Sequence, residues 1–387
     1  MKEQYITDIT QVPFFQTLKN WEQEKLLQVT SQYPFRASEH YLSLIEWENP
    51  KDPLKRIIFP HPDELNMSGS QDPSQESQFT VQHGLQHKYP QTALLLLSDE
   101  CGGICRFCFR KRLFMNCSRQ SIRDYSPALD YIRSHPEVTD VLLSGGDPLI
   151  LPTARLKMVF KEIREIEHIS IIRIGTKMLA YNPSRIIEDQ EFVNLIQSES
   201  TAEKKIYVMA HFNHPNEISP QSIEAIYLLQ KAGAIVVNQT PVIEGVNAET
   251  TVMSELFRKL AFIGVSPYYV FQCRPTIGNH VFTVPVEQSY RIMHSAFQRC
   301  SGLAKRARFI MSHRTGKIEV VGQNCHNIFM RYHQAADPDD YNKFMISQSN
   351  PKARWFDDYQ LMTPVSNSIR GSLFEGDPGI HSGTVTF

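Results

Sequence analysis

Short apolar runs alternate with longer amphipathic stretches from Ala93 onward. Six of the runs have the length and composition of buried strands: ALLLLS, TDVLLSGG, ISIIRIG, KIYVMAHF, AIVVNQ and PYYVFQ. The stretches between them, with helical spacing of apolar residues, include 152–167, 183–198, 220–232 and 249–263. Such alternation favours right-handed βαβ crossovers and a parallel sheet. We therefore predict an α/β fold, a partial (β/α)6 TIM-like barrel.

The regions on either side of this pattern differ from it. Apolar positions at helical spacing are scattered through the start of the chain, and residues 66–80 are rich in Ser, Gln and Asp. We expect an N-terminal helical region with a polar connecting loop over 1–80, the barrel over 81–312, and a short C-terminal extension over 313–387. The closing letters GDPGIHSGTVTF are typical of a loop or tail.

Composition and charge narrow the class of partner. With 387 residues and 41% hydrophobic side chains, the chain can bury a full core. Its 40 Lys and Arg balance 41 Asp and Glu, so no basic field attracts nucleic acid or an anionic membrane. The first letters, MKEQYITDITQVPFF, lack a basic segment before an apolar core, and no eighteen-residue apolar stretch occurs. We expect a cytoplasmic protein with small-molecule partners.

Polar and special residues follow each predicted strand. In chain order these segments are CGGICRFC, GGDP, GTK, HFNHP, NQT and QCR. The carboxyl ends of the strands build the active site in parallel α/β barrels. The sequence therefore predicts a site at this end of the barrel.

Three cysteines, Cys101, Cys105 and Cys108, stand together in the first of these segments, with two glycines between them. Structural zinc usually takes four ligands in paired motifs, and an electron-carrying iron–sulfur cluster usually takes four thiolates. Three thiolates on a four-iron cluster leave one iron open to a reactive ligand. The other cysteines are scattered and form no second pair: Cys117, Cys273, Cys300 and Cys325.

The spacing CxxxCxxC, with Phe107 before the last cysteine, resembles the radical S-adenosylmethionine (SAM) superfamily, in which the open iron binds the methionine part of SAM. The segment holding Gly145, Gly146 and Asp147 looks like the superfamily's Gly-Gly segment, whose backbone meets the methionyl amine. A narrower resemblance, to the lysine 2,3-aminomutase family, covers most of the chain. It is carried by DPLKRIIFP, GLQHKYP, the cysteine loop, RIGT, HFNHPNEISP, NQTPVIEGVN, PYYVFQC and TGKIEVV.

This resemblance implies three cofactors: a [4Fe-4S] cluster, SAM and pyridoxal 5'-phosphate (PLP). The cluster splits SAM, and PLP carries the migrating nitrogen. By resemblance, His211 and Gln239 contact SAM and Lys317 is the Schiff-base lysine. Tyr89 lies near the PLP phosphate, and Arg112 is a candidate phosphate partner because guanidinium groups match phosphate oxygens.

The substrate pocket departs from the lysine-specific pattern. Arg110 resembles the family arginine that pairs with the substrate α-carboxylate, whereas Thr92 stands where the family commonly has an arginine. Lysine-specific members hold the distal ammonium with two aspartates, and the corresponding positions here are Arg274 and Ser312. A guanidinium in a closed cavity disfavours a substrate ammonium and favours an acidic side chain. The family also contains a glutamate 2,3-aminomutase.

The resemblance thus implies an isomerase that moves an α-amino group to the β-carbon of an amino acid other than lysine, such as glutamate. We expect a reductant such as flavodoxin or ferredoxin, and a homo-oligomer. Three alternatives stay open. They are a radical SAM enzyme of this fold without PLP, a lysine aminomutase-like enzyme serving translation-factor modification, and a non-enzymatic metal-binding or electron-transfer protein.

Overall fold

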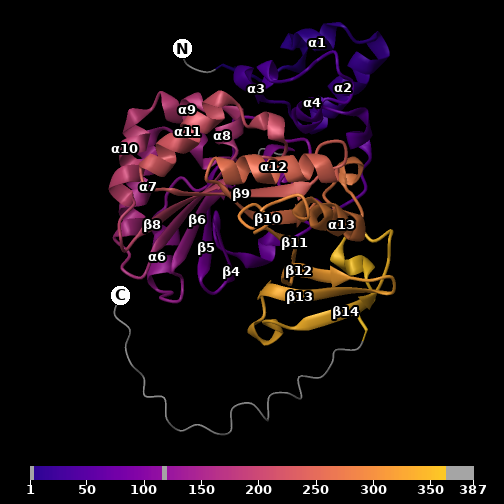
Figure 1. The fold of residues 1–387 in the computed structure, drawn as a ribbon. Coiled ribbons are helices and arrows are strands. Elements are labelled where there is room, and N and C mark those ends of the chain that lie inside the picture. The colour runs from indigo at the N-terminus through magenta and orange to yellow at the C-terminus, as the bar shows by residue number, and fades with distance from the viewer. Residues whose placement is uncertain (1–3, 116–119, 363–387) are drawn as a thin grey trace.

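A twelve-stranded sheet organises the computed structural model, which describes residues 4–115 and 120–362. Its strands run in chain order from β3 to β14 across the sheet (Figure 1). Six central strands pair in parallel and coincide with the six predicted runs, which confirms the partial barrel. They are β5 (Thr92–Ser98), β6 (Asp140–Gly145), β7 (Ile171–Thr176), β8 (Lys205–Ala210), β9 (Ile235–Val242) and β10 (Ser266–Gln272).

Helices cover the outer side of the barrel, as Figure 1 shows. The predicted helix over 183–198 is wrong in one respect, because it is divided in two at Asp189. The Asp189 carboxylate accepts the Phe192 N–H at 2.9 Å and so starts a new helix. The covering helices are α6 (Ser126–Arg133), α7 (Thr153–Arg164), α9 (Ser184–Ile187), α10 (Gln190–Glu199), α11 (Pro220–Lys231), α12 (Thr250–Phe262) and α13 (Val286–Phe297).

Strands that the sequence analysis did not anticipate extend the sheet at both edges. An antiparallel pair, β3 (Thr80–Gln82) and β4 (Leu85–Tyr89), precedes β5. On the other side β11 (Arg308–His313) is parallel to β10, so the parallel part has one strand more than predicted. Three antiparallel strands complete the sheet around a second apolar core that includes Met330 and Trp355. They are β12 (Gly316–Gln323), β13 (Asn327–Ala335) and β14 (Phe344–Gln348).

The N-terminal region packs against the cysteine loop. Backbone N–H groups of Ile104 and Arg106 donate to the carbonyls of Arg36 and Ile57 at 2.9 and 2.8 Å. The Arg106 guanidinium forms a buried ion pair with Glu64 at 2.9 Å. The remaining helices and strands are β1 (Tyr5–Ile6), α1 (Pro13–Gln16), α2 (Asn20–Gln32), β2 (Ala37–Ser38), α3 (Glu39–Ser43), α4 (Pro53–Ile58), α5 (Arg112–Met115) and α8 (Met178–Tyr181).

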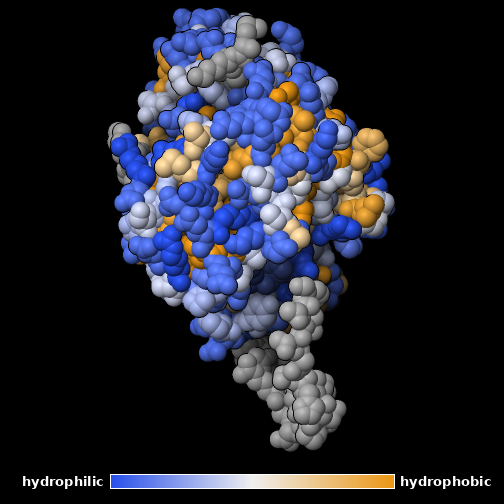
Figure 2. Space-filling model, turned by 90° about the vertical axis from the view of Figure 1, so that its left-hand side faces the viewer, coloured by the Kyte–Doolittle hydropathy of each residue, from blue (hydrophilic) through white to orange (hydrophobic). Residues whose placement is uncertain are grey.

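The surface carries mostly polar side chains. The face in Figure 2 is largely hydrophilic, with hydrophobic side chains interspersed among them. Within the described ranges, no helix has both the length and the apolar character needed to cross a membrane. The predicted C-terminal tail, GDPGIHSGTVTF, lies outside the described residues.

Candidate active site

A cavity of about 350 Å³ lies at the carboxyl ends of the parallel strands. Segments that follow β5, β6, β7, β8 and β10 contribute to its wall. It brings together every site residue predicted from the sequence except Arg112. These residues are Tyr89, Cys101, Cys105, Phe107, Cys108, Arg110, Gly145, Gly146, Asp147, His211, Gln239, Arg274, Ser312 and Lys317.

The three cysteines of the loop after β5 all reach this cavity. Yet in the part of the chain that the structure describes, no three His, Cys, Asp or Glu side chains are grouped to hold a metal ion. Cysteine thiolates are the ligands that iron–sulfur clusters use, so three thiols in one cavity are of the right chemical type for such a cluster. Burial raises the pKa of Cys105 to about 12, so binding to iron is needed to convert this thiol to a thiolate near neutral pH.

The glycine pair after β6 lies directly against the start of the cysteine loop. Gly145 has a φ of +127°, and a Cβ there would come 2.3 Å from the Ser98 carbonyl oxygen. A Cβ on Gly146 would come 2.2 Å from the Glu100 carbonyl oxygen. The Gly146 N–H donates to that Ser98 oxygen at 2.6 Å. Only glycine allows this approach, which fixes the cysteine loop relative to β6.

Asp147 joins the loops after β6 and β7. Its carboxylate accepts hydrogen bonds from the Thr176 hydroxyl at 2.8 Å and the Lys177 N–H at 2.7 Å. Burial raises the pKa of Asp147 to about 6, against the opposing effect of these donors. Asp147 therefore acts in the structure as a connector between the two loops.

His211 and Gln239 meet at the ends of β8 and β9. The Gln239 Nε2 lies 2.5 Å from the His211 Nε2, so the amide donates and the ring nitrogen accepts. Burial, followed by the charges of Lys177 and Arg110, lowers the pKa of His211 to about 3. The imidazole is therefore neutral near pH 7 and leaves the side-chain amide in a fixed orientation.

Lys317 projects into the cavity from β12. Its Nζ donates to the Gln334 Oε1 at 2.6 Å and lies 5.0 and 5.2 Å from the ring centroids of Tyr89 and Tyr269. Burial, followed by the charges of Arg173 and Lys88, lowers the pKa of Lys317 to about 7. Near pH 7 such a lysine is partly neutral, and a neutral amine is a competent nucleophile toward a carbonyl.

Arg110 is held by partners within the chain. Its guanidinium donates to the Glu76 carboxylate at 2.9 Å and to the Ser144 hydroxyl at 2.9 Å. Arg112 also pairs with Glu76, and it lies 3.8 Å from Asp72. Burial alone would raise the pKa of Glu76, but Arg110 and Arg112 outweigh it and lower the pKa to about 2.

Glu76 is a site residue that the sequence analysis missed. It comes from the segment 66–80, expected only to be a polar connecting loop, and it is 8% exposed. No spacing or motif marks it, because its partners follow more than thirty residues later. Arg112, expected to meet phosphate, is instead engaged by this carboxylate outside the set of lining residues.

Arg274 differs from the other arginines of the site. Among the described residues, its guanidinium has no hydrogen-bond acceptor or ion-pair partner, and its Nη1 is buried. The group stacks on Phe109 at 3.6 Å from the ring centroid. Ser312 lies opposite Lys317 in the antiparallel pair β11–β12 and adds no charge. An unpaired guanidinium in a cavity provides a binding position for an anion.

Three further basic residues line the cavity without having been predicted as site residues: Lys177, which pairs with Glu217, and the two residues Arg173 and Lys88. Arg173 donates to Asp140 at 2.8 Å and to the Thr92 hydroxyl at 3.3 Å, so a guanidinium from β7 lies beside Thr92. Lys88 donates to the His313 carbonyl at 2.6 Å. Both lie near Lys317, where they are suited to a phosphate group.

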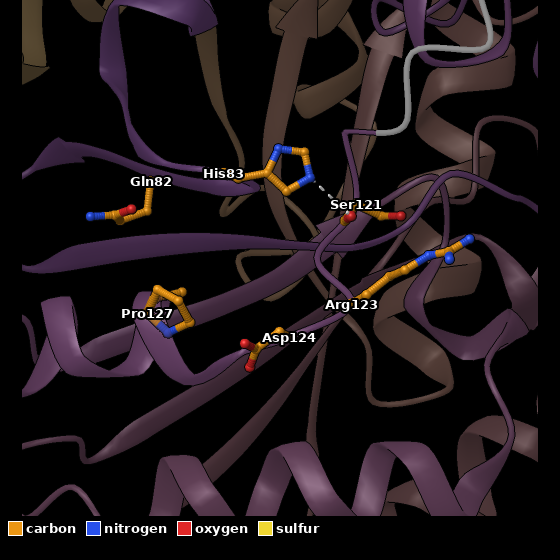
Figure 3. Close-up of a pocket in the computed structure, with 7 residues that line it drawn as sticks. Gln82, His83, Ser121, Arg123, Asp124 and Pro127 are labelled. Atoms are coloured by element: carbon orange, nitrogen blue, oxygen red, sulfur yellow. Dashed lines mark hydrogen bonds between the residues drawn. The ribbon is translucent and has the colours of Figure 1, made fainter.

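A second hollow lies elsewhere on the surface, and Figure 3 shows the side chains around it, among them Gln82, His83, Ser121, Arg123 and Asp124. His83 lies 3.3 Å from the Ser121 carbonyl oxygen. This hollow has none of the cysteines or the lysine of the first cavity. The chemistry predicted from the sequence is therefore confined to the first cavity.

Comparison with known proteins finds relatives that match most of the chain. A protein of Aquifex aeolicus described as "Putative L-lysine 2,3-aminomutase" is 47% identical over 372 residues, covering 96% of this chain and 99% of that protein. The chain belongs to the lysine 2,3-aminomutase family. The L-lysine 2,3-aminomutase of Clostridium subterminale is 37% identical over 73% of this chain and 67% of its own length. The glutamate 2,3-aminomutase of Clostridioides difficile is 33% identical over 77% and 70%. No protein-family model matches the chain.

As a radical SAM aminomutase the protein is an isomerase, and the cofactors of its family are a [4Fe-4S] cluster, SAM and PLP. Its cavity fits these groups on independent grounds. Three thiols and a glycine pair line one cavity, and the same cavity holds a lysine of lowered pKa among basic residues.

Proposed function

We propose that this aminomutase acts on an amino acid with an acidic side chain, such as glutamate, and that it depends on PLP bound to Lys317. Arg274 carries this proposal, because it is a cationic group of the cavity wall whose buried Nη1 has no hydrogen-bond acceptor among the described residues. The Glu76 carboxylate acts on its charge, but that carboxylate is itself paired with Arg110 and Arg112. Arg274 replaces a carboxylate position of the lysine-specific pattern. The cavity therefore offers the distal end of the substrate a positive charge.

The charge of the whole wall supports this choice. Six lining side chains described in the structure are Lys or Arg and two are Asp or Glu. Both carboxylates are already engaged: Glu76 by Arg110 and Arg112, and Asp147 by hydrogen bonds from the loop after β7. A substrate ammonium would therefore lack a carboxylate and would meet Arg274, at a cost of several kcal/mol in a closed cavity.

The residues divide between the cofactors. Cys101, Cys105 and Cys108 would hold the cluster, and the Gly145–Gly146 backbone, with His211 and Gln239, would meet SAM. Lys317 would hold PLP, whose phosphate suits the basic group formed by Arg173 and Lys88, with Tyr89 beside it. When bound, the cluster supplies the electron that splits SAM, and PLP supplies a π system for the nitrogen that moves.

The side chains of the cavity would bind the cofactor and the substrate, orient them, and shield them from water. Lys317 presents a partly neutral amine, and Gln334 fixes the position of that amine through a 2.6 Å hydrogen bond. Arg110 is oriented by Glu76 and Ser144 and offers its guanidinium edge to the substrate α-carboxylate. Aromatic side chains such as Phe107, Phe109 and Tyr269 line the same wall and exclude water from the radical chemistry.

The test is anaerobic reconstitution with iron, sulfide, SAM and PLP, followed by incubation with a panel of amino acids and chromatography of the products. We expect β-glutamate, or the β-isomer of another acidic amino acid, and no β-lysine. Formation of β-lysine at a comparable rate would defeat the acidic assignment. Equal turnover without PLP would instead favour a radical SAM enzyme of this fold that works without that cofactor.

A further inference from the structure

Tyr181 stands next to the cysteine loop and is not part of any motif that the sequence analysis used. It ends α8, the four-residue helix after β7, and is 1% exposed. Its hydroxyl oxygen lies 2.8 Å from the Cys105 sulfur. Tyr181 also lines the cavity, so the contact lies at the wall where the cluster would bind.

The donor in this contact follows from the chemistry of the cluster. A thiol and a phenol can each donate, but a cysteine bound to iron is a thiolate and has no proton to give. The Tyr181 O–H must then donate and the Cys105 sulfur accept. Hydrogen bonds to cluster sulfurs withdraw charge from the cluster and favour its reduced state.

We propose that Tyr181 is a positioning residue that donates a hydrogen bond to the cluster ligand Cys105 and raises the reduction potential of the cluster. The inference rests on the proposed assignment of the three cysteines to the cluster. It goes beyond that assignment, because it gives a residue outside the motif a role in how readily the cluster accepts the electron that starts the reaction.

The surroundings hold the Tyr181 ring in place. A Cβ on Gly103 would lie 3.0 Å from the ring, and one on Gly102 would lie 2.4 Å from the Met178 sulfur in the same helix. The two glycines inside CGGIC thus make room for α8 against the loop. Ser38 donates a hydrogen bond to the Tyr181 carbonyl, and the Tyr41 ring packs edge-on at 4.7 Å between centroids.

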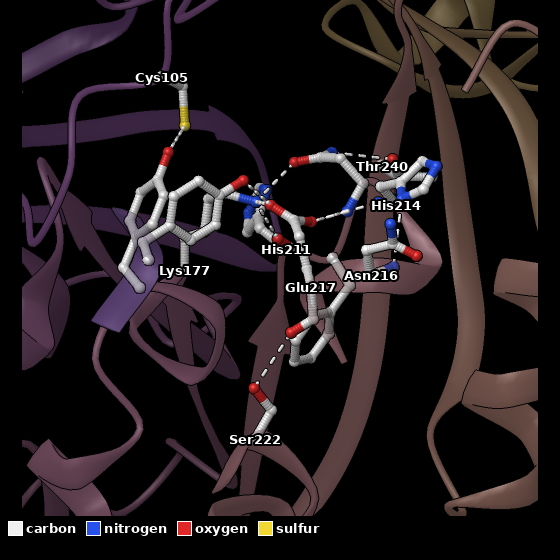
Figure 4. Close-up of polar contacts among 12 residues, drawn as sticks. Cys105, Lys177, His211, His214, Asn216, Glu217, Ser222 and Thr240 are labelled. Atoms are coloured by element: carbon white, nitrogen blue, oxygen red, sulfur yellow. Dashed lines mark hydrogen bonds and ion pairs between the residues drawn. The ribbon is translucent and has the colours of Figure 1, made fainter. Parts of the chain in front are cut away.

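A buried charge network lies behind the ring. Figure 4 shows Cys105 at one side of the contacts around Lys177 and Glu217. The Lys177 ammonium lies 5.1 Å from the Tyr181 ring centroid. The ammonium cannot replace the Tyr181 hydroxyl as donor. Its hydrogen bonds go to three other acceptors: the His211 carbonyl, Asn213 and Glu217.

Glu217 would oppose reduction if its charge faced the cluster alone. Its carboxylate instead pairs with Lys177 at 2.6 Å and accepts the Tyr41 hydroxyl at 2.6 Å and the His214 N–H at 3.2 Å. The ion pair is neutral as a unit, so it adds no net negative charge beside the cysteines. The Tyr181 hydroxyl remains as the group that contacts the sulfur.

The test compares reconstituted wild-type protein with Tyr181→Phe, which keeps the ring and removes the hydroxyl. At a fixed applied potential, we expect the ratio of reduced to oxidised cluster, measured by electron paramagnetic resonance, to fall roughly tenfold, a shift of about 59 mV for one electron. Iron and sulfide contents should equal those of the wild type. Tyr41→Phe is the matched control, since its hydroxyl belongs to the same network and does not contact sulfur; its ratio should stay that of the wild type.

An unchanged ratio in a fully loaded Tyr181→Phe protein would overturn the inference. If that variant fails to fold or to hold a cluster, electron–nuclear double resonance of the wild type in D₂O tests instead whether an exchangeable proton lies at hydrogen-bond range of the cluster. We expect an exchangeable deuteron coupled to the cluster at hydrogen-bond range, and its absence would overturn the inference equally. Failure of the wild type to assemble any cluster is a different result, because it rejects the cofactor assignment itself.

Discussion

The two walls of the cavity are completed in different ways. On the cysteine wall, polar groups have partners within the chain: the Gly146 N–H has a carbonyl, Asp147 has three donors, and His211 has Gln239. Around Lys317, basic side chains crowd together, and the buried Nη1 of Arg274 has no hydrogen-bond acceptor among the described residues. The polar groups of the first wall are therefore satisfied within the chain, whereas the positive charges of the second wall would be neutralised by bound ligands.

This difference teaches where specificity resides. A wall whose hydrogen bonds are already satisfied can hold one cofactor arrangement for many substrates. A wall with unmet positive charge selects among substrates, because burying an unpaired charge is costly and a ligand of opposite charge removes that cost. We therefore expect loss of a cluster ligand on the first wall to abolish the reaction, and replacement of Arg274 on the second wall to change substrate preference.

The largest effect should follow loss of a cluster ligand. Changing Cys101, Cys105 or Cys108 to Ala should leave the purified protein with little bound iron and no formation of 5′-deoxyadenosine, because each thiolate would hold one iron. Iron analysis and chromatography after anaerobic incubation with SAM measure both. Cys325→Ala, at an exposed cysteine, is the control and should stay fully active. Full activity in any of the three cysteine-to-alanine variants would contradict the assignment of these cysteines as cluster ligands.

Removal of Lys317 should abolish the attachment of PLP without affecting the binding of the cluster. Borohydride reduction of the PLP-loaded wild type should fix PLP covalently to the peptide that contains Lys317, as read by mass spectrometry. Lys317→Ala should lose this label and its turnover, yet keep its iron. Lys88 is the competing position for attachment, since it is a second cavity lysine whose pKa is lowered to about 7. Labelling of Lys88 in the wild type would contradict the assignment.

Arg274→Gln should weaken the preference for an acidic substrate without changing the binding of either cofactor. Truncating one partner of a buried ion pair costs about 2–5 kcal/mol, so kcat/KM for the acidic substrate should fall by between about 30-fold and about 4,000-fold. Cluster content and covalent PLP should not change. Arg274→Lys, which keeps the charge, should recover part of the loss. An equal loss in both variants would show that the charge of Arg274 is not what the substrate meets.

The smallest effect is a shift in pH dependence. Lys317 attacks PLP as the neutral amine, so the rate at which PLP-free protein captures PLP should rise with pH through a midpoint near 7 and then level off. Lys88 lowers the pKa of Lys317 by charge repulsion. Lys88→Ala removes that repulsion, so the midpoint should move to higher pH. Stopped-flow absorbance of PLP gives the rates, and a midpoint near 10 would contradict the lowered pKa.

The sequence by itself determined the features that depend on residues close together in the chain. Short continuous apolar runs and the helical stretches between them predicted the six central strands, because each pattern is local. The cysteine triplet and the glycine pair predicted one wall of the site, since their chemistry depends on close spacing. The antiparallel β12 and β13 were missed. Their alternation of buried and half-exposed residues, as in NIFMRYHQA, was weak beside the continuous apolar runs of the barrel.

Only the tertiary structure decided which distant residues meet. Glu76 pairs with Arg110 and Arg112 because a polar segment folds back over the barrel, and nothing in its own letters shows that it is buried. Tyr181 reaches Cys105 across 76 positions because Gly102 and Gly103 leave room for α8. Burial and charge in three dimensions set the pKa of Lys317 and leave Arg274 without a partner. Such properties depend on distances between side chains, and local sequence does not contain those distances.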